Sequence, residues 1–278
     1  MAAKPVKSVA VIGLGKMGGP MAAHLVAKGF EVRGFDINRK LMEAARRAGA
    51  RAARSPAEAA RASELVIVVV GFDSEVDKVL FGKRGVIEGA RAGTVIAIAS
   101  TVPPDYMRAL PKRLGRKRLE LVDAPLCRGE PAAEAGKLLV LAGGTRAAFA
   151  RCRPAFSAFA DAIHHLGGLG AGQVGKMVNN LILWACISAN YEGLKLGRTL
   201  GVDEEKLRRA LLVSSARNWP LETWHEQRSM PWAEKDMSIV LHEADMARIA
   251  LPLSGALKEV IKGIKIEKGY GMPRAAKG

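Results

Sequence analysis

The sequence predicts a doubly wound α/β domain with a parallel sheet, followed by an all-helical domain led by one long interdomain helix. Three observations predict this fold class. Short apolar strand-like runs alternate with helical segments up to residue 165, a glycine-rich turn follows the first run, and only helical periodicity appears after residue 170. A chain of 278 residues suits one large or two modest domains. We therefore expect domains at 1–167 and 168–278, joined at the glycine-rich residues 167–170.

The expected strands are short and mostly apolar. They span residues 8–12, 31–35, 65–70, 94–99, 119–122, 138–142 and 162–165. Residues 17–28 and 39–48 carry apolar side chains at helical spacing, and Gly29 and Gly49 stand where helix C-caps are common. Strands and helices in alternation are typical of a parallel sheet with helices on its faces.

The second domain begins with an expected long helix over residues 172–200, which contains no proline and is largely apolar. A helix of this composition is mostly buried. Further helices are predicted over 203–213, 232–250 and 252–268, and residues 273–278 are expected to form a loose tail.

Composition and charge exclude several classes of protein. Hydrophobic residues make up 49% of the chain, which is enough for a core and argues against disorder. The net charge of +16 would attract a polyanion, but aromatic residues are only 5% and none interleaves the basic clusters, so a nucleic-acid partner is disfavoured. We expect a solvated basic face, whose field an anionic substrate could also use.

Cysteine usage and hydropathy bear on the compartment. The longest apolar runs, residues 65–70 and 181–187, are shorter than the roughly 18–20 residues that span a bilayer, so no membrane helix is expected. The three cysteines, Cys127, Cys152 and Cys186, lack the spacing of a zinc site or of a disulfide scaffold. We therefore expect a cytoplasmic protein that binds no metal.

The first glycine-rich turn has the form of a dinucleotide-binding loop. Residues 9–18 read VAVIGLGKMG, which places Gly13, Gly15 and Gly18 in a GxGxxG pattern between a strand and a helix. In such Rossmann-type turns the first glycine permits the tight turn, the second lets the backbone approach a pyrophosphate, and the third allows close helix packing. The expected cofactor contacts also include the residues in between: Leu14, Lys16 and Met17.

Asp36 closes the second expected strand, about where dinucleotide-binding domains carry an acidic residue. Its carboxylate can accept both ribose hydroxyls of NAD and would repel the 2′-phosphate of NADP, so NAD is favoured. Arg39 is close enough in sequence to serve a 2′-phosphate, and NADP stays open. The simpler alternative is that Asp36 caps the next helix.

Residues 13–25 read GLGKMGGPMAAHL, which resembles the N-terminal signature of the β-hydroxyacid dehydrogenases, the family of 3-hydroxyisobutyrate dehydrogenase and tartronate semialdehyde reductase. The usual signature has Asn where this chain has His24. Further matches follow in the family's order: Ser100-Thr101, DAPLCRG at 123–129, GAGQVGKMVNN at 170–180 and Lys235-Asp236. The resemblance covers nearly the whole chain.

This resemblance implies an NAD(P)-dependent 3-hydroxyacid dehydrogenase or semialdehyde reductase, which transfers hydride between nicotinamide and a small β-hydroxy acid or its semialdehyde. It also implies an active site in the cleft between the two domains and a homodimer or homotetramer. Cofactor contacts are expected at Val70 and Thr101, and Lys235 is expected to contact both cofactor and substrate.

Lys176 is the expected catalytic residue. In the pattern GxGxxxKxxNN, Lys176 and Asn180 are four residues apart and share one face of a helix. An ammonium beside a substrate hydroxyl can stabilise a developing alkoxide and exchange its proton. The alternative is an ordinary helix lysine that reaches to solvent. The family resemblance implies that Lys176 is the acid/base or oxyanion residue and that Asn180 orients the substrate.

The segment 126–129 departs from the family pattern and is expected to bind substrate. Many relatives carry Ser-Gly-Gly where this chain has Cys127, Arg128 and Gly129 after Leu126. Arg128 brings a planar fork that can hold a carboxylate, sulfonate or phosphate, as the arginine of the similar loop in sulfolactaldehyde reductases does for a sulfonate. Alternatively, Arg128 faces solvent or bonds Glu130 or Glu134. Cys127 is not expected to be a nucleophile, because hydride transfer needs no covalent catalysis.

Two other functions stay open at this stage. A dehydrogenase-like domain can be a catalytically silent module that binds nucleic acid or another partner, and the charge of +16 fits that possibility. Lys176 argues against it, since a silent module has little chemical need for this lysine. An imine reductase of related architecture is a lower alternative, because such enzymes usually lack a lysine at this position.

Overall fold

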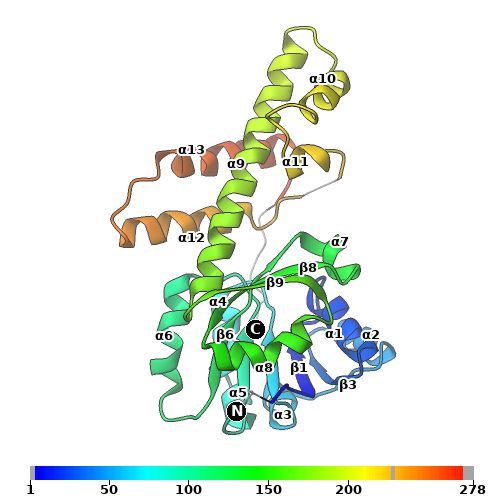
Figure 1. Cartoon of the computed structure of the whole chain (residues 1–278), viewed down its shortest axis with the longest axis vertical. Coiled ribbons are helices and arrows are strands. Elements are labelled where there is room, and N and C mark those ends of the chain that lie inside the picture. Colours follow the sequence, from blue (N-terminus) through cyan, green and yellow to red (C-terminus); the bar gives the residue numbers. More distant parts are fainter. Residues whose placement is uncertain (1–3, 227–228, 272–278) are drawn as a thin grey trace. The chain divides into compact units, whose positions relative to one another are not determined.

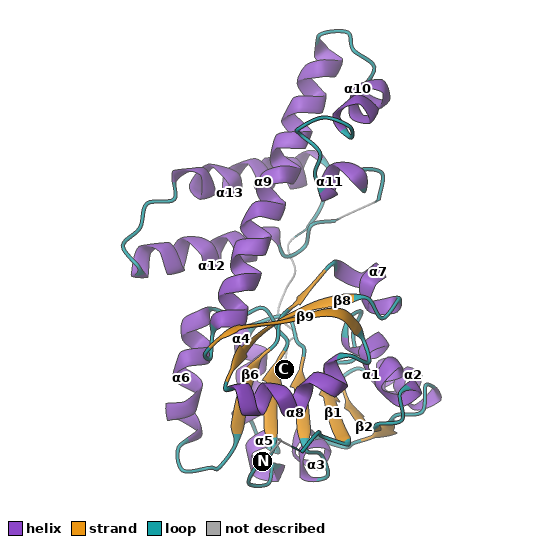
Figure 2. Ribbon diagram, viewed as in Figure 1, coloured by secondary structure: helices purple, strands orange, loops and turns teal. Residues whose placement is uncertain are grey.

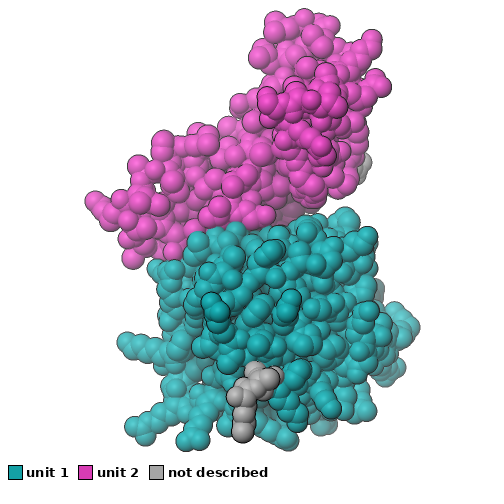
Figure 3. Space-filling view, in the orientation of Figure 1, with its two compact units in different colours: residues 1–176, 275–278 teal, residues 177–274 magenta. Residues whose placement is uncertain are grey.

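The computed structural model describes residues 4–226 and 229–271 (Figure 1, Figure 2). The chain divides into two compact units. Unit 1 comprises the described residues up to Lys176, and unit 2 comprises those from Met177 onward (Figure 3). The division falls inside helix α9 (Ala171–Thr199), which therefore contributes residues to both units.

Unit 1 is built around a nine-stranded sheet with the order β3-β2-β1-β4-β5-β6-β8-β7, in which β9 pairs with β8. Its strands are β1 (Ser8–Ile12), β2 (Glu31–Phe35), β3 (Arg51–Ala52), β4 (Leu65–Val68), β5 (Val95–Ile98), β6 (Glu120–Asp123), β7 (Leu126–Cys127), β8 (Leu138–Gly144) and β9 (Ala160–Gly167). The six strands from β3 to β6 are parallel, and the strand order reverses between β1 and β4. A reversal of this kind is where doubly wound sheets bind nucleotides.

Helices cover both faces of the sheet. They are α1 (Gly18–Ala27), α2 (Arg39–Arg47), α3 (Pro56–Arg61), α4 (Asp73–Phe81), α5 (Val86–Gly89), α6 (Pro104–Leu114), α7 (Gly129–Glu134) and α8 (Arg146–Phe156). On β1, Val9 and Val11 pack with α1 and α8, whereas Ala10 and Ile12 pack with α3, α4 and α6. Both faces of the central strands are therefore buried, which explains why these strands read as continuous apolar runs.

The far end of the sheet departs from the parallel pattern. Strand β8 runs antiparallel to both β6 and β7, and only β9 is parallel to it. The chain turns after β7 at Arg128 and Gly129, whose φ angles are both positive. The sequence indicated a strand near residues 138–142, but strand direction depends on long-range pairing, which an apolar run does not encode.

Unit 2 is helical throughout its described part. After α9 come α10 (Glu204–Leu211), α11 (Trp219–Glu222), α12 (Ala233–Met246) and α13 (Pro252–Glu267). Its core joins α9, α12 and α13 through Trp184, Ile187, Met237 and Ile261. The predicted fold class, a doubly wound sheet followed by helices led by one long helix, is thus confirmed. None of the helices in the described residues is long and apolar enough to cross a membrane.

Candidate active site

The three glycines of the loop between β1 and α1 differ in the space around them. A Cβ atom on Gly13, which has a φ of 92°, would lie 2.2 Å from the carbonyl oxygen of Val69, and one on Gly18 would lie 1.9 Å from that of Gly13. A Cβ atom on Gly15 would meet nothing within 4 Å. Packing therefore requires the outer two glycines, while Gly15 faces open space, as close approach of a pyrophosphate needs. The loop fits a dinucleotide.

Asp36 follows β2 and is tied to this loop. Its Oδ2 accepts a hydrogen bond from the Leu14 amide at 2.7 Å, and its Oδ1 accepts one from the Asn38 amide at 2.7 Å. The side chain that caps α2 belongs to Asn38, which accepts from the Lys40 amide. Asp36 therefore places a negative charge beside the glycine loop instead of capping the helix.

The carboxyl ends of β4 and β5 are joined by Ser100. Its hydroxyl oxygen accepts a hydrogen bond from the Val70 amide at 2.8 Å. The side chain of Gln173, on the first turn of α9, donates to the Ser100 carbonyl at 2.8 Å and accepts from the Val102 amide at 3.2 Å. Because Gln173 is only 1% exposed, it forms a buried clamp on both sides of Thr101.

The start of α9 is also held by Asp123, the last residue of β6. Its side chain is fully buried and accepts hydrogen bonds from the backbone amides of Gly170, at 2.7 Å, and Gln173, at 2.8 Å. Burial raises the pKa of Asp123, although these hydrogen bonds oppose the rise. A Cβ atom on Gly172 would lie 2.4 Å from the Leu141 carbonyl oxygen, so a glycine is required where α9 meets the sheet.

Lys176 follows Gln173 by three residues and reaches the segment after β6. Its Nζ lies 3.9 Å from the Sγ atom of Cys127, which is buried in β7 beside the buried Leu126. Lys176 is half-buried as a residue, so it is not an ordinary surface lysine. The structure thus brings together Lys176 and the loop in which the sequence predicts substrate binding.

Arg128 has a different partner from those that the sequence suggested. Its Nη1 donates to the Lys137 carbonyl at 2.9 Å and pairs with the carboxylate of Asp161 on β9. Within the described residues, its Nε and Nη2 atoms have no hydrogen-bond partner. Arg128 also adopts a left-handed φ of 82°, which is uncommon for a residue with a side chain. The turn is therefore held by the arginine side chain itself.

Helix α7, which follows this turn, is fastened to the glycine loop and to α1. Lys16 pairs with Glu130 at 2.9 Å, and His24 Nε2 lies 3.0 Å from the Glu134 carbonyl oxygen. A Cβ atom on Gly136 would lie 3.1 Å from the imidazole of His24. His24, which replaces the usual asparagine, thus packs against the C-terminal end of α7, the helix that follows the segment expected to bind substrate.

In unit 2, Asn180 on α9 faces Asp236 on α12. The Asn180 amide nitrogen donates to Asp236 Oδ2 at 2.8 Å, and Trp184 Nε1 donates to the same oxygen at 3.2 Å. Both polar side chains are buried, with Asn180 4% and Asp236 5% exposed. Lys235 instead places its Nζ 5.5 Å from the centre of the Trp232 ring. Of the two neighbours, Asp236 is the one that contacts Asn180.

Comparison with known proteins agrees with this geometry. Residues 8–167 match the family model for the NAD binding domain of 6-phosphogluconate dehydrogenase, and residues 170–272 match the one described as NAD-binding of NADP-dependent 3-hydroxyisobutyrate dehydrogenase. The chain is 32% identical to 3-hydroxyisobutyrate dehydrogenase of Pseudomonas aeruginosa, with 90% of this chain and 89% of that protein aligned. The chain belongs to the β-hydroxyacid dehydrogenase family.

Two further comparisons extend the finding. The β-hydroxyacid dehydrogenase described here is 30% identical to 3-sulfolactaldehyde reductase of Escherichia coli, over 91% of this chain and 88% of that protein. It superposes on the structure of Mycobacterium tuberculosis 3-hydroxyisobutyrate dehydrogenase with a TM-score of 0.86 at 25% identity, covering 96% of each chain. These matches support an NAD(P)-dependent oxidoreductase and not a catalytically silent module.

Some residues that shape the site in this β-hydroxyacid dehydrogenase were not predicted. Asp123, Gln173 and Asp236 carry buried polar contacts, and none of them was among the predicted site residues. The sequence did carry a signal for Asp123. An acidic side chain at the end of an apolar strand needs hydrogen-bond donors, and the backbone amides at a glycine-rich helix start supply them. Nothing in the sequence indicated that Asp236 would face Asn180.

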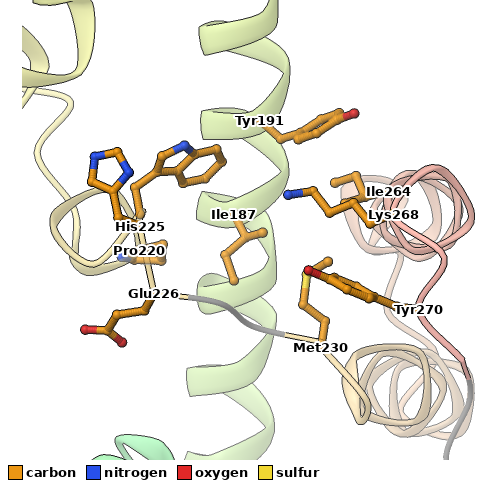
Figure 4. A pocket seen from close by; sticks show the side chains of 10 residues that line it. Ile187, Tyr191, Pro220, His225, Glu226, Met230, Ile264, Lys268 and Tyr270 are labelled. Carbon is orange, nitrogen blue, oxygen red and sulfur yellow. The ribbon is translucent and has the colours of Figure 1, made fainter. Parts of the chain in front are cut away.

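Unit 2 of this β-hydroxyacid dehydrogenase also contains a cavity of about 230 Å³ (Figure 4). Ile187, Met230 and Ile264 form its apolar part, and Tyr191 and Tyr270 stand beside it. None of the residues predicted to bind cofactor or substrate lines this cavity. The predicted site therefore does not depend on it.

Proposed function

We propose that this β-hydroxyacid dehydrogenase interconverts a small anionic β-hydroxy acid and its semialdehyde, with NAD as the preferred cofactor. The single observation that carries the proposal is the position of Lys176 beside Cys127, on a helix whose first turn is held by Asp123. Relatives named for 3-hydroxyisobutyrate and 3-sulfolactaldehyde support this substrate class.

The residues proposed to hold the cofactor are those of the glycine loop with Asp36, Val70 and Thr101. In this proposal the pyrophosphate takes the open space beside Gly15, and the Asp36 carboxylate next to the loop would accept ribose hydroxyls and repel a 2′-phosphate. Arg39 at the start of α2 is exposed and is the residue that could serve NADP. The bound nicotinamide would supply the hydride chemistry, and the chain supplies position and charge.

Lys176 is proposed to exchange a proton with the substrate oxygen. In oxidation the neutral amine of Lys176 would accept the hydroxyl proton while the carbinol hydrogen leaves as hydride for the nicotinamide, and in reduction the Lys176 ammonium would give a proton to the aldehyde oxygen. Its positive charge also stabilises the developing alkoxide. Asn180 is proposed to orient the substrate, and Lys235 to contact substrate and cofactor.

The segment from Leu126 to Gly129 is proposed to set the substrate's anionic group. Arg128 keeps Nε and Nη2 for a ligand while Nη1 is engaged by Asp161 and Lys137. A planar guanidinium can then hold a carboxylate or sulfonate with its remaining edge. The arginine pairing makes the loop rigid before substrate binds, which lowers the cost of binding.

We also propose a homodimer or homotetramer in the cytoplasm. Helix α9 exposes large apolar side chains, among them Val178, Ile182 and Leu196. Exposed apolar side chains that gather on one helix are typical of protein interfaces. No disulfide joins Cys127, Cys152 and Cys186 in the described part of the chain, which fits a reducing compartment.

The test is a nicotinamide absorbance assay with NADH and NADPH against semialdehydes that pair carboxylate with sulfonate analogues. We expect turnover with NADH, a loss of about 10²- to 10⁴-fold in Lys176→Ala, and a larger loss for the anionic aldehydes than for neutral ones in Arg128→Ala. Arg153→Ala, an exposed arginine on α8, is the matched control. If Lys176→Ala keeps more than about a tenth of wild-type turnover, the role of Lys176 is wrong.

A further inference from the structure

Asp236 is a buried carboxylate that contacts the proposed substrate residue Asn180. It lies in the first turn of α12, where the helix dipole stabilises a negative charge. Its Oδ2 accepts from Asn180 on one turn of α9 and from Trp184 on the next. A buried charge is tolerated when donors converge on it in this way, so the arrangement joins α12 to α9.

The chemistry of a carboxylate decides how the Asn180 amide is turned. An ionised Asp accepts hydrogen bonds and cannot donate them, so the nitrogen and not the oxygen of the Asn180 amide must face Asp236. The opposite end agrees with this orientation, because Asn180 Oδ1 accepts from the Asn179 amide nitrogen at 2.9 Å. The two neighbours therefore fix both ends of the amide, which could otherwise rotate by half a turn.

This arrangement uses only one of the two side-chain N–H groups of Asn180. The amide nitrogen has two protons, of which Asp236 takes one, while the amide oxygen is engaged by Asn179. Asn180 can then offer a ligand a donor much more readily than an acceptor. A ligand atom that meets it must be a hydrogen-bond acceptor, such as an oxygen of a carboxylate, sulfonate or hydroxyl.

We propose that Asp236 is a positioning residue that locks Asn180 as a hydrogen-bond donor to a substrate oxygen. This inference rests on the proposed function and narrows it, because it fixes which kind of atom Asn180 binds. Asp236 acts through Asn180 and touches no reacting atom. Replacing its acceptor-only carboxylate with an amide removes the constraint, since an amide can present either a donor or an acceptor to Asn180.

The kinetic test is a double-mutant cycle of Asp236→Asn and Asn180→Ala. We expect Asp236→Asn to lower kcat/KM for the hydroxy acid by about 10- to 100-fold, the range for losing a hydrogen bond to a charged group. In the Asn180→Ala background the same change should cost less than about twofold, because its target is gone. The matched control is Asp245→Asn, an exposed aspartate on the same helix, which should leave kcat/KM unchanged.

Losses that multiply in the double variant would overturn the inference, as would an Asp236→Asn variant within twofold of wild type. An Asn180→Ala variant with full activity overturns it as well. Thermal unfolding of each variant identifies any that fail to fold. Asp236→Glu, which restores an acceptor-only group, should recover part of the activity, which a general loss of packing would not allow.

A second readout needs no substrate and keeps the inference separate from the proposed reaction. Hydrogen exchange of the Asn180 side-chain amide, followed by ¹⁵N nuclear magnetic resonance, should be slow in the wild type and in Asp245→Asn but fast in Asp236→Asn. Equal exchange in all three proteins would refute the locking contact. Slow exchange without turnover on any aldehyde would retain the lock and reject the proposed substrate class.

Discussion

Replacement of Gln173 by methionine tests how α9 is fixed to the sheet. The side chain of Gln173 bridges the Ser100 carbonyl and the Val102 amide, at 2.8 and 3.2 Å, and is 1% exposed. Methionine has a similar length and helix propensity, so Gln173→Met removes the two hydrogen bonds with little change in shape. The Ser100 and Val102 groups are then left without these partners in a buried place.

The expected cost follows from those two groups. A buried backbone group that loses its partner costs about 1–3 kcal/mol, so two such groups cost about 2–6 kcal/mol if neither finds water. Because two units can unfold separately, a single global free energy is not the best measure. A better measure is local: the hydrogen-exchange protection of the Val102 amide. We expect this protection to fall by at least about tenfold, because 1.4 kcal/mol corresponds to a factor of ten.

A second substitution sharpens the test. Gln173→Glu keeps an acceptor for the Val102 amide but turns a carboxylate oxygen toward the Ser100 carbonyl, where neither can donate. Its protonated form can donate to Ser100, so the destabilisation of Gln173→Glu should shrink at low pH, whereas that of Gln173→Met should not. Because Thr101 lies between the two clamped groups, both variants should also bind NADH more weakly. Unchanged Val102 protection and NADH affinity in Gln173→Met would refute the clamp.

Three further outcomes can be measured directly. Gly15→Ala should fold with an unchanged melting temperature but bind NADH at least about tenfold more weakly, as measured by calorimetry. Gly18→Ala should melt at a lower temperature, because its Cβ would lie 1.9 Å from a carbonyl oxygen. Cys127→Ser should keep turnover within about threefold, and a loss beyond about 100-fold would mean that the thiol takes part in catalysis. The backbone hydrogen bond from Lys7 lowers the pKa of Glu64. The ionised Glu64 carboxylate therefore stabilises the fold fully above the unfolded pKa of about 4.3, and this stabilisation is lost as pH falls through the folded pKa. The difference in melting temperature between wild type and Glu64→Gln should shrink in acid.

The parts of the fold that the sequence predicted well are those with local signals. The strands at 8–12 and 31–35 have the predicted bounds, and the long helix α9 is shifted by one residue at each end. An apolar run flanked by glycines and polar turns indicates a buried strand from a few residues of sequence, whatever its direction. The glycine loop was also predictable, because its turn chemistry is local.

The parts that were not predicted depend on contacts between distant segments. Arg128 pairs with Asp161, which lies on a different strand, and the sequence offered only the nearby Glu130 and Glu134 as partners. The antiparallel direction of β8 has the same origin. A side chain's partner across a sheet is set by strand order and register, and neither is encoded in the residues around that side chain.

Different residues hold the first turn of α9 and the turn at Arg128, although Lys176 Nζ lies 3.9 Å from Cys127 in the adjoining strand β7. Asp123 and Gln173 fix the first turn of α9 through backbone amides and carbonyls of β5, β6 and the helix itself. Arg128 fixes its own turn through Asp161 on β9 and the Lys137 carbonyl just before β8, the strand that pairs with β6. Because the two sets of hydrogen bonds share no residue, we expect a substitution at Arg128 to change the proposed anion contact and to leave the hydrogen bonds of Asp123 and Gln173 in place. A chain that has lost the usual Ser-Gly-Gly sequence can on this account retain the same proton chemistry.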